Sequence, residues 1–281
     1  MIKVYFPNES KQTLGGGFTF FNTIIQYFSK QKDIEVVFNS DQADIIFICG
    51  ATLIKGDQLA AWKAKGKKII LRVDNVPKDS RNRGCGFSRL RKCAEAADIV
   101  IYQSQWAKNY TMPLTKKDGP VIYNGCDQSI FYPSKDSKPN FDIYYLFANY
   151  NRDENKRFPE AAYHFSQLYK QDNERKLRIV GNFSPEMVQY NFDFFNGEKI
   201  EYYGVVDSRE QMADIMRKSQ VLLFPAYADA CPQTVIEAIS CGLKIELVSR
   251  VGGTMELINM PREYFNVERM GDEYLQAIKS L

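Results

Sequence analysis

Two carboxylates and a helix-start sequence stand close together in the second half of the chain. Asp229 and Glu237 are separated by seven residues and follow the apolar run Val-Leu-Leu-Phe-Pro at 221–225. The Pro-Gln-Thr sequence at 232–234 is typical of a helix N-terminus, where first-turn amides and the helix dipole favour anionic oxygens. The spacing predicts an anion site with two flanking hydrogen-bond acceptors. The alternative is that Asp229 is solvated in a loop and Glu237 interacts only with the helix dipole.

A pair of cations follows a second apolar run, Ile-Tyr-Tyr-Leu-Phe-Ala-Asn-Tyr at 143–150. Arg152 and Lys156 stand where this predicted strand gives way to a helix. Two fixed cations can neutralise the negative charge that develops on a departing phosphate group, which is the role of metal ions in other sites. The alternative is that both are solvated charges at a helix start.

Three glycines follow the first apolar run of the chain, at 2–6. Gly15, Gly16 and Gly17 open a helix that is expected from Phe18. A glycine run at a strand-to-helix turn allows the backbone to approach a ligand closely, although many loops contain one. Together with the cations and the carboxylates, it predicts one wall of a binding site.

The carboxylate segment resembles the C-terminal signature of family 4 glycosyltransferases, in which a strand ending in Pro leads to Glu-x7-Glu. Here the sequence runs from Pro225 through Asp229 to Glu-Ala-Ile-Ser-Cys-Gly at 237–242 and Val-Gly-Gly-Thr-Met-Glu at 251–256, with Asp as the first acid. The cation pair is similar to the family's Gly-Arg-x4-Lys-Gly stretch, without the glycines. The run Val-Ile-Tyr-Asn-Gly-Cys-Asp at 121–127, with Phe131 and Pro133, resembles a third family stretch.

The resemblance implies a sugar transferase that retains anomeric configuration, uses a nucleoside diphosphate-sugar as donor and needs no metal or other cofactor. It gives the third stretch only an architectural role, with a tight Asn-Gly turn and Phe131 packed between domains. It implies a donor site, and catalytic roles for the two cations and the two carboxylates. The implied catalytic residues are Arg152, Lys156, Asp229 and Glu237, and the implied donor-binding residues are Gly15, Gly16, Gly17, Arg152, Lys156, Pro232, Gln233, Thr234 and Glu237.

The elements that must position these residues alternate between short apolar runs and amphipathic stretches, in two series. This rhythm predicts two Rossmann-like, doubly wound α/β domains, and the resemblance implies that they face each other across a cleft, as in the GT-B fold. A polar, proline-bracketed segment separates the series. We predict an N-terminal acceptor-side domain at 1–133 and a C-terminal nucleotide-sugar-binding domain at 140–281. Whether the final helix of the second domain packs on the first domain stays open. Strands are expected at 2–6, 34–38, 44–49, 68–73, 98–103, 121–123, 142–149, 177–181, 199–203, 221–225 and 243–248, and helices at 18–31, 57–66, 88–97, 105–110, 158–171, 208–219, 234–241, 254–260 and 270–281.

Composition and absences narrow the class of protein. The 281 residues include one histidine and six scattered cysteines, which disfavours a structural zinc site. The net charge is only +3, so any binding of a polyanion must come from a local patch of charge. No Asp-x-Asp triplet occurs, which disfavours the metal-dependent, single-domain sugar transferases. The sequence shows neither a signal peptide nor a membrane-spanning run. We therefore expect a cytoplasmic protein and leave peripheral membrane contact open.

A cation-rich stretch at 78–92 is the candidate acceptor surface. It contains six basic residues against one acid, and it predicts docking of an anionic acceptor: a lipid phosphate surface, a lipid-linked or phosphorylated glycan, or nucleic acid. Asp74, at the end of an earlier strand, is a candidate for orienting an acceptor hydroxyl. The alternative is a solvated loop and helix. The candidate acceptor residues are Asp74, Arg81, Arg83, Arg89 and Lys92.

Other functions on the same scaffold stay open at this point. A nucleotide-sugar epimerase is expected to carry more acid and base side chains than a chain with one histidine offers. A pyridoxal phosphate-dependent phosphorylase would need a much longer chain. A catalytically silent protein that binds a nucleotide, a glycan or nucleic acid is the remaining alternative.

Overall fold

A computed structural model of the chain describes residues 1–7, 16–74, 76, 86–134, 143–149, 156–183 and 199–281. It divides into two compact units, each of which collects segments that are distant in sequence. The first unit comprises Met1–Gly125, Asp229–Cys231 and Phe265–Leu281, and the second comprises Cys126–Ala228 and Pro232–Tyr264. The predicted domains, 1–133 and 140–281, follow chain order, whereas these units do not. A three-residue segment and the last helix belong with the first unit.

The first unit is built on a five-stranded parallel sheet with the order β2-β1-β3-β4-β5. Its strands are β1 (Ile2–Tyr5), β2 (Ile34–Val37), β3 (Ile45–Ile48), β4 (Lys68–Val73) and β5 (Ile99–Tyr102). Its helices are α1 (Gly16–Phe28), the 3-10 helix η1 (Ala51–Leu53), α2 (Gly56–Ala64), α3 (Gly86–Ala96), α4 (Gln105–Thr115) and α10 (Val267–Lys279).

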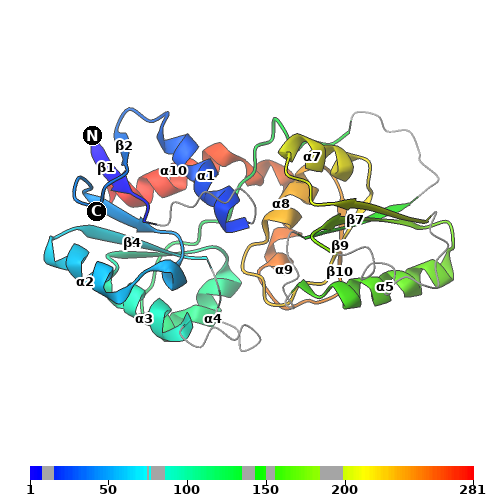
Figure 1. Ribbon diagram of the computed structural model, residues 1–281, viewed down its shortest axis with the longest axis horizontal. Helices are drawn as coiled ribbons and strands as arrows, with labels where there is room; N and C mark the ends of the chain where they lie inside the picture. Colours follow the sequence, from blue (N-terminus) through cyan, green and yellow to red (C-terminus); the bar gives the residue numbers. More distant parts are fainter. Residues whose placement is uncertain (8–15, 75, 77–85, 135–142, 150–155, 184–198) are drawn as a thin grey trace. The chain divides into compact units, whose positions relative to one another are not determined.

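Alternating residues of the first sheet pack into two separate cores, because successive side chains of a strand point to opposite faces. Ile45 and Phe47 of β3 pack with α1 and α10, whereas Ile46 and Ile48 pack with α2 and α3. The four helices accordingly cover the sheet as two layers (Figure 1). At Gly271 of α10 an added Cβ would lie 2.5 Å from ring atoms of Tyr27 in α1, so the close packing of these helices requires glycine there.

The second unit contains a parallel sheet with the order β10-β9-β6-β7-β8. Its strands are β6 (Tyr144–Asn149), β7 (Lys176–Gly181), β8 (Ile200–Gly204), β9 (Val221–Phe224) and β10 (Lys244–Leu247). Its helices are α5 (Phe158–Gln171), α7 (Arg209–Arg217), α8 (Gln233–Ser240) and the short α9 (Thr254–Leu257), and the 3-10 helix η4 (Arg262–Phe265) follows. Phe147 of β6, Leu223 of β9 and Phe165 of α5 lie in one core on one face of this sheet.

The two doubly wound parallel sheets confirm the predicted fold class, and the largest differences from the predicted elements are at 121–123 and 105–110. The strand expected at 121–123 is an isolated bridge between Val121 and Tyr102. Pro120, which has no N–H, precedes it, and the chain leaves the sheet edge directly afterwards. The helix expected at 105–110 continues to Thr115, because Thr115 is buried and its hydroxyl lies 2.7 Å from the Tyr102 hydroxyl.

The expected tight turn at the Asn-Gly pair is also absent. Asn124 and Gly125 lie in a stretch without turn structure, and Gly125 is not among the glycines with positive φ. An added Cβ at Gly125 would lie 2.4 Å from the carbonyl oxygen of Asn266. Glycine is therefore required there by the close approach of two backbones and not by a turn.

Candidate functional site

The strand order of the second unit changes direction between β6 and β9. In doubly wound sheets, ligands bind outside the carboxyl ends of the strands at such a point. The segment after β6, which ends at Asn149, leads to Lys156 and α5, and the segment after β9, which ends at Phe224, leads to α8. The topology therefore brings the predicted cation segment and the predicted carboxylate helix to one edge of one sheet.

The cation segment is only partly described. Arg152 lies within 150–155, outside the described residues, while Lys156 directly precedes the helix start at Arg157. Three residues separate Arg152 from Lys156, one fewer than in the Arg-x4-Lys pattern, so that Arg157 stands at the longer spacing. Arg157 has a left-handed backbone (φ 52°) and its Nε lies 2.8 Å from Glu160 Oε1. Lys156 and Arg152 remain the predicted diphosphate-binding cations.

Helix α8 begins after Pro232, which stands at the N-cap with φ −67° and ψ 119°. Pro232 makes no side-chain cap hydrogen bond, and the first turn, at Gln233 and Thr234, carries the positive end of the helix dipole. Gln233 is the first helical residue, which places Glu237 in the second turn and not in the first. The helix start thus has the chemistry of an anion site.

Glu237 is buried and ion-paired within the second unit. Its Oε1 lies 3.1 Å from Nη2 of Arg209, the first residue of α7, and the Gln233 side chain also hydrogen-bonds to it. Only 8% of the residue is exposed. Burial raises the pKa of Glu237 above its ordinary value, while the charge of Arg209 and the hydrogen bonds from Gln233 and Arg209 act in the opposite direction. Arg209 thus favours the ionised form of a carboxylate that burial disfavours.

Arg209 was not among the predicted site residues. Its guanidinium lies over the ring of Phe131, 4.8 Å from the ring centroid, so the Phe131 expected to pack between domains supports this arginine inside the second unit. A sequence signal did exist: Arg209 is the first residue of α7, where the helix dipole favours acids and disfavours cations. Such a local conflict is typical of a functional position.

Cys126 and Cys241 also face Glu237. Burial is the main cause that raises the pKa of both thiols, to about 12, and the negative charge of Glu237 acts in the same direction. Both cysteines are therefore neutral, and Arg209 is the charged group among these neighbours that compensates the carboxylate. The Cys126 thiol donates a hydrogen bond to Ser240 Oγ at 3.1 Å, within the same unit.

Asp229 belongs to a different unit from Glu237. The segment Asp229–Cys231 is part of the first unit, although the residues on both sides of it belong to the second. The residue before it, Ala228, has a left-handed backbone (φ 52°), which is rare for a residue with a Cβ. The two predicted carboxylates are therefore close in sequence but are positioned by separate bodies.

In the first unit the strand order changes direction between β1 and β3. Helix α1, which follows β1, begins at Gly16, and Gly17 lies in its first turn, so these two predicted glycines stand at the switch point of this sheet. Gly15 lies outside the described residues. An added Cβ at Gly17 would meet no atom of the described residues within 4 Å, so this part of the fold does not itself require glycine there.

The predicted acceptor residues are only partly described. Asp74 follows the last residue of β4, while Arg81 and Arg83 lie outside the described residues. Arg89 and Lys92 are exposed on α3, but the Arg89 Nη1 donates a hydrogen bond to the carbonyl oxygen of Thr52. Arg89 is thus partly engaged within its own unit, and Lys92 presents its charge to solvent.

Two further features of the described residues bear on the site. No group of three His, Cys, Asp or Glu side chains among them is placed to hold a metal ion. No helix in the described part of the chain is both long enough and apolar enough to cross a membrane.

Two doubly wound parallel sheets, with a helix N-terminus that follows the switch point of one of them, define a protein of the GT-B-like class. The sequence profile of the family "Glycosyl transferases group 1" matches residues 133–274, half of the chain. The chain belongs to this family and is a nucleotide-sugar-dependent glycosyltransferase. No curated protein matches the chain at a significant level.

Solved structures support the fold. HepE from Anabaena, in complex with UDP, is 13% identical over the full length of both chains, with a TM-score of 0.76. The lipopolysaccharide outer core galactosyltransferase WaaB, in its apo form, is 16% identical over 99% of each chain, with a TM-score of 0.66. A putative UDP-N-acetylglucosamine 2-epimerase from Listeria monocytogenes is 14% identical over 99% of this chain and 88% of its own, with a TM-score of 0.60.

Proposed function

We propose that this chain transfers a sugar from a UDP-sugar to an acceptor hydroxyl, with retention of configuration and without a metal ion. The observation that carries the proposal is the buried Glu237, ion-paired to Arg209 at 3.1 Å on the helix that follows the switch point of the second sheet. A buried carboxylate whose ionised form is favoured by a neighbouring arginine is suited to accept hydrogen bonds from the paired hydroxyls of a ribose. The UDP bound in the HepE structure supports UDP as the nucleotide.

We assign the remaining donor contacts to the residues predicted from the sequence. The first turn of α8, at Pro232, Gln233 and Thr234, binds the diphosphate through its amides and dipole. Lys156 and Arg152 neutralise the charge on the departing UDP. Gly15, Gly16 and Gly17 leave room beside the donor, and Asp229 accepts a hydrogen bond from a sugar hydroxyl.

The transfer step needs no protein nucleophile. The bond from the anomeric carbon to the β-phosphate oxygen breaks as the acceptor oxygen attacks the same face of the sugar. The acceptor proton passes to the departing phosphate, so the products are the glycoside and UDP. The protein supplies a positioned acceptor and cations at the phosphate.

We assign acceptor binding to the first unit. The exposed Lys92 and the cations of the 78–92 stretch favour an anionic acceptor, such as a lipid-linked or phosphorylated glycan. Nucleic acid would bind through the same charges. Contact with the surface of an anionic membrane is compatible with this placement.

A donor panel tests the proposal. The protein is incubated with UDP-, GDP-, ADP- and TDP-sugars in EDTA without acceptor, and the released nucleotide and sugar are followed by NMR. We expect slow hydrolysis of a UDP-sugar that yields free UDP, unchanged by EDTA, with the sugar released first in the anomeric form of the donor. Inverted sugar would exclude retention, and dependence on added metal would exclude metal independence.

The same spectra decide between the enzyme classes. A 2-epimerised sugar nucleotide would favour the epimerase activity suggested by the fold shared with the Listeria protein. Donor binding without turnover, with or without a glycan acceptor panel, would favour a catalytically silent binding protein.

Gly17→Ala should separate a binding role of the glycine run from a structural one. Among the residues with described positions, none has an atom within 4 Å of the added methyl. Alanine is favoured over glycine in a helix by about 1 kcal/mol, so we expect an unchanged or higher melting temperature. If the donor approaches the backbone here, the methyl takes up its space and the donor KM should rise about fivefold, roughly the loss of one hydrogen bond. Gly56→Ala, likewise at a helix start with open space around it, is the control. An unchanged donor KM in Gly17→Ala would remove the glycine from the site.

A further inference from the structure

The first unit contains a buried cation, Arg72, whose hydrogen-bond partners among the described residues are neutral oxygens. Its Nη2 donates to Gln103 Oε1 at 2.7 Å and to Asn124 Oδ1 at 2.9 Å, and its Nε donates to the Tyr274 hydroxyl at 3.1 Å. The guanidinium also stacks on Phe20, 3.6 Å from the ring centroid. Only 2% of Arg72 is exposed. A buried charge is tolerated only where it is well hydrogen-bonded, so this cluster is rigidly specified.

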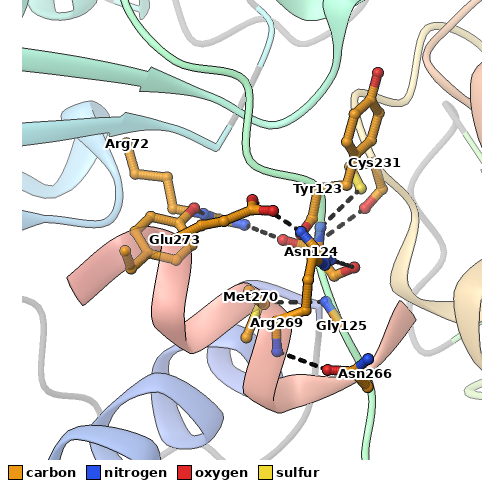
Figure 2. Close-up of polar contacts among 10 residues, drawn as sticks. Arg72, Tyr123, Asn124, Gly125, Cys231, Asn266, Arg269, Met270 and Glu273 are labelled. Carbon is orange, nitrogen blue, oxygen red and sulfur yellow. Dashed lines mark hydrogen bonds and ion pairs between the residues drawn. The ribbon is translucent and has the colours of Figure 1, made fainter. Parts of the chain in front are cut away.

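Asn124 connects this cation to the segment that carries Asp229. Its Nδ2 donates to the carbonyl oxygen of Cys231 at 3.1 Å, and its backbone N–H donates to Cys231 Sγ at 3.4 Å. The amide oxygen binds Arg72 while the amide nitrogen binds Cys231, so both ends of one side chain are used (Figure 2). The arginine thereby fixes which end of the amide faces the segment Asp229–Cys231.

The backbone of Asn124 is itself fixed by the start of α10. Arg269 Nη2 donates to the carbonyl oxygens of Tyr123 and Asn124 at 2.9 and 3.2 Å, and the N–H of Gly125 donates to Met270 Sδ at 3.1 Å (Figure 2). Side chain and backbone of Asn124 are therefore held from two directions. Asn124 is therefore a fixed point to which Cys231 is hydrogen-bonded.

A second contact holds the segment Asp229–Cys231 within the first unit. Ala230 is buried in a small apolar cluster with Val76 and Ala107 of the first unit, against which Trp106 packs. The cluster anchors the middle of the segment, and Asn124 anchors its end at Cys231. Asp229 stands directly before these two anchored residues.

We propose that Asn124, oriented by Arg72, is a positioning residue that holds the Asp229–Cys231 segment so that Asp229 reaches the donor sugar. The proposal rests on the function proposed above, in which Asp229 contacts a sugar hydroxyl. The Asn-Gly stretch at 124–125 then takes part in the transfer reaction, whereas the family resemblance implied only an architectural role for it.

The matched variants Asn124→Asp and Gln103→Glu test it. Each replaces an amide that binds Arg72 by a carboxylate, which retains the acceptor and pairs the buried cation. Asn124→Asp loses the donor to Cys231, whereas Gln103→Glu loses only the donor to the carbonyl oxygen of Val73, at 2.8 Å. Melting temperatures of both should equal or exceed that of the wild type, since a buried cation gains a counter-charge.

Two measurements distinguish the variants. For acceptor-free hydrolysis of the UDP-sugar turned over fastest by the wild type, kcat should fall about fivefold in Asn124→Asp, roughly the effect of one lost hydrogen bond, with the donor KM unchanged. Gln103→Glu should show no such loss. Hydrogen–deuterium exchange at the amides of Ala230 and Cys231 should accelerate in Asn124→Asp and not in Gln103→Glu.

The double variant Asn124→Asp/Asp229→Asn tests whether Asn124 acts on kcat through Asp229. Since Asn124 acts through Asp229, adding Asn124→Asp to Asp229→Asn should cause no further loss of kcat. Equal losses of kcat in Asn124→Asp and Gln103→Glu would overturn the proposal. So would additive losses of kcat in the double variant, or unchanged exchange at Ala230 and Cys231 in Asn124→Asp. A wild type that hydrolyses no donor would count against the proposed function instead, and the exchange comparison would still decide whether Asn124 holds the segment.

Discussion

Glu237→Gln is expected to lower the affinity for UDP and for UDP-sugars by about 10- to 100-fold, since a hydrogen bond to a charged group contributes roughly 1.5–3 kcal/mol. The substitution preserves the shape of the side chain but removes the charge that accepts bonds from ribose hydroxyls. Isothermal titration calorimetry with UDP measures the affinity, and kcat/KM for donor hydrolysis should fall in parallel.

Glu246→Gln is the matched control for this experiment. Glu246 lies on β10 of the same unit, is more exposed, and is paired with His164 at 3.2 Å. Its replacement should leave UDP affinity within twofold of the wild type. Circular dichroism of both variants checks the fold, because Glu237→Gln leaves Arg209 without its carboxylate. A folded Glu237→Gln protein that binds UDP as tightly as the wild type would contradict the donor site.

Arg209→Met is expected to make donor binding more strongly dependent on pH. Arg209 opposes the burial that raises the pKa of Glu237, so its removal raises that pKa further. The ionised carboxylate is the form that binds ribose hydroxyls, and donor affinity is therefore present above the pKa and lost as the pH falls through it. At pH 6 we expect a lower affinity for a UDP-sugar than that of the wild type, with a smaller deficit at pH 8.

Arg217→Met provides a matched control on the same helix. Arg217 also stacks on an aromatic ring, that of Tyr132 at 4.4 Å, but pairs with Asp214 and not with Glu237. It should leave the pH profile unchanged. UDP-sugars suit the measurement because their diphosphate does not titrate in this range. An equal loss at every pH in Arg209→Met would show that Arg209 contacts the donor directly and does not act through Glu237.

Stability provides an independent check with a defined sign. The pKa of Glu237 is raised in the folded protein, so its ionisation is easier in the unfolded chain. The free energy of unfolding is therefore higher at acid pH, where Glu237 is protonated in both states, and it falls as the pH rises through the folded-state pKa of Glu237. Arg209→Met should therefore lose more melting temperature relative to the wild type at pH 8 than at pH 5.

The fold was predictable because its signals are local. Short apolar runs separated by amphipathic stretches define the strands and helices of both sheets, and β4 was predicted with its observed bounds. The helix start before Glu237 was equally visible in the Pro-Gln-Thr sequence. Predictions failed where tertiary contacts decide, as at 121–123, where one bridge to Tyr102 replaces a strand.

The partners of the candidate site were not predictable for the same reason. Arg209 meets Glu237 across 28 positions of the sequence, and Asn124 meets Cys231 across 107. No periodicity or motif encodes such pairs in a single sequence. The spacing of Asp229 and Glu237 predicts a single feature that contains both acids. In the structure, however, the segment Asp229–Cys231 belongs to the first unit and Glu237 to the second.

The membership of Asp229–Cys231 in the first unit also bears on how the chain can be recombined with relatives. A chimera joined near residue 133 would take Cys231 and α10 from one parent and Asn124 from the other, and would separate contacts that hold a three-residue segment in place. Exchange of donor specificity between relatives should therefore succeed more often when Asn124, Cys231 and α10 come from the same parent. Modularity in this molecule follows the compact units and not the order of the sequence.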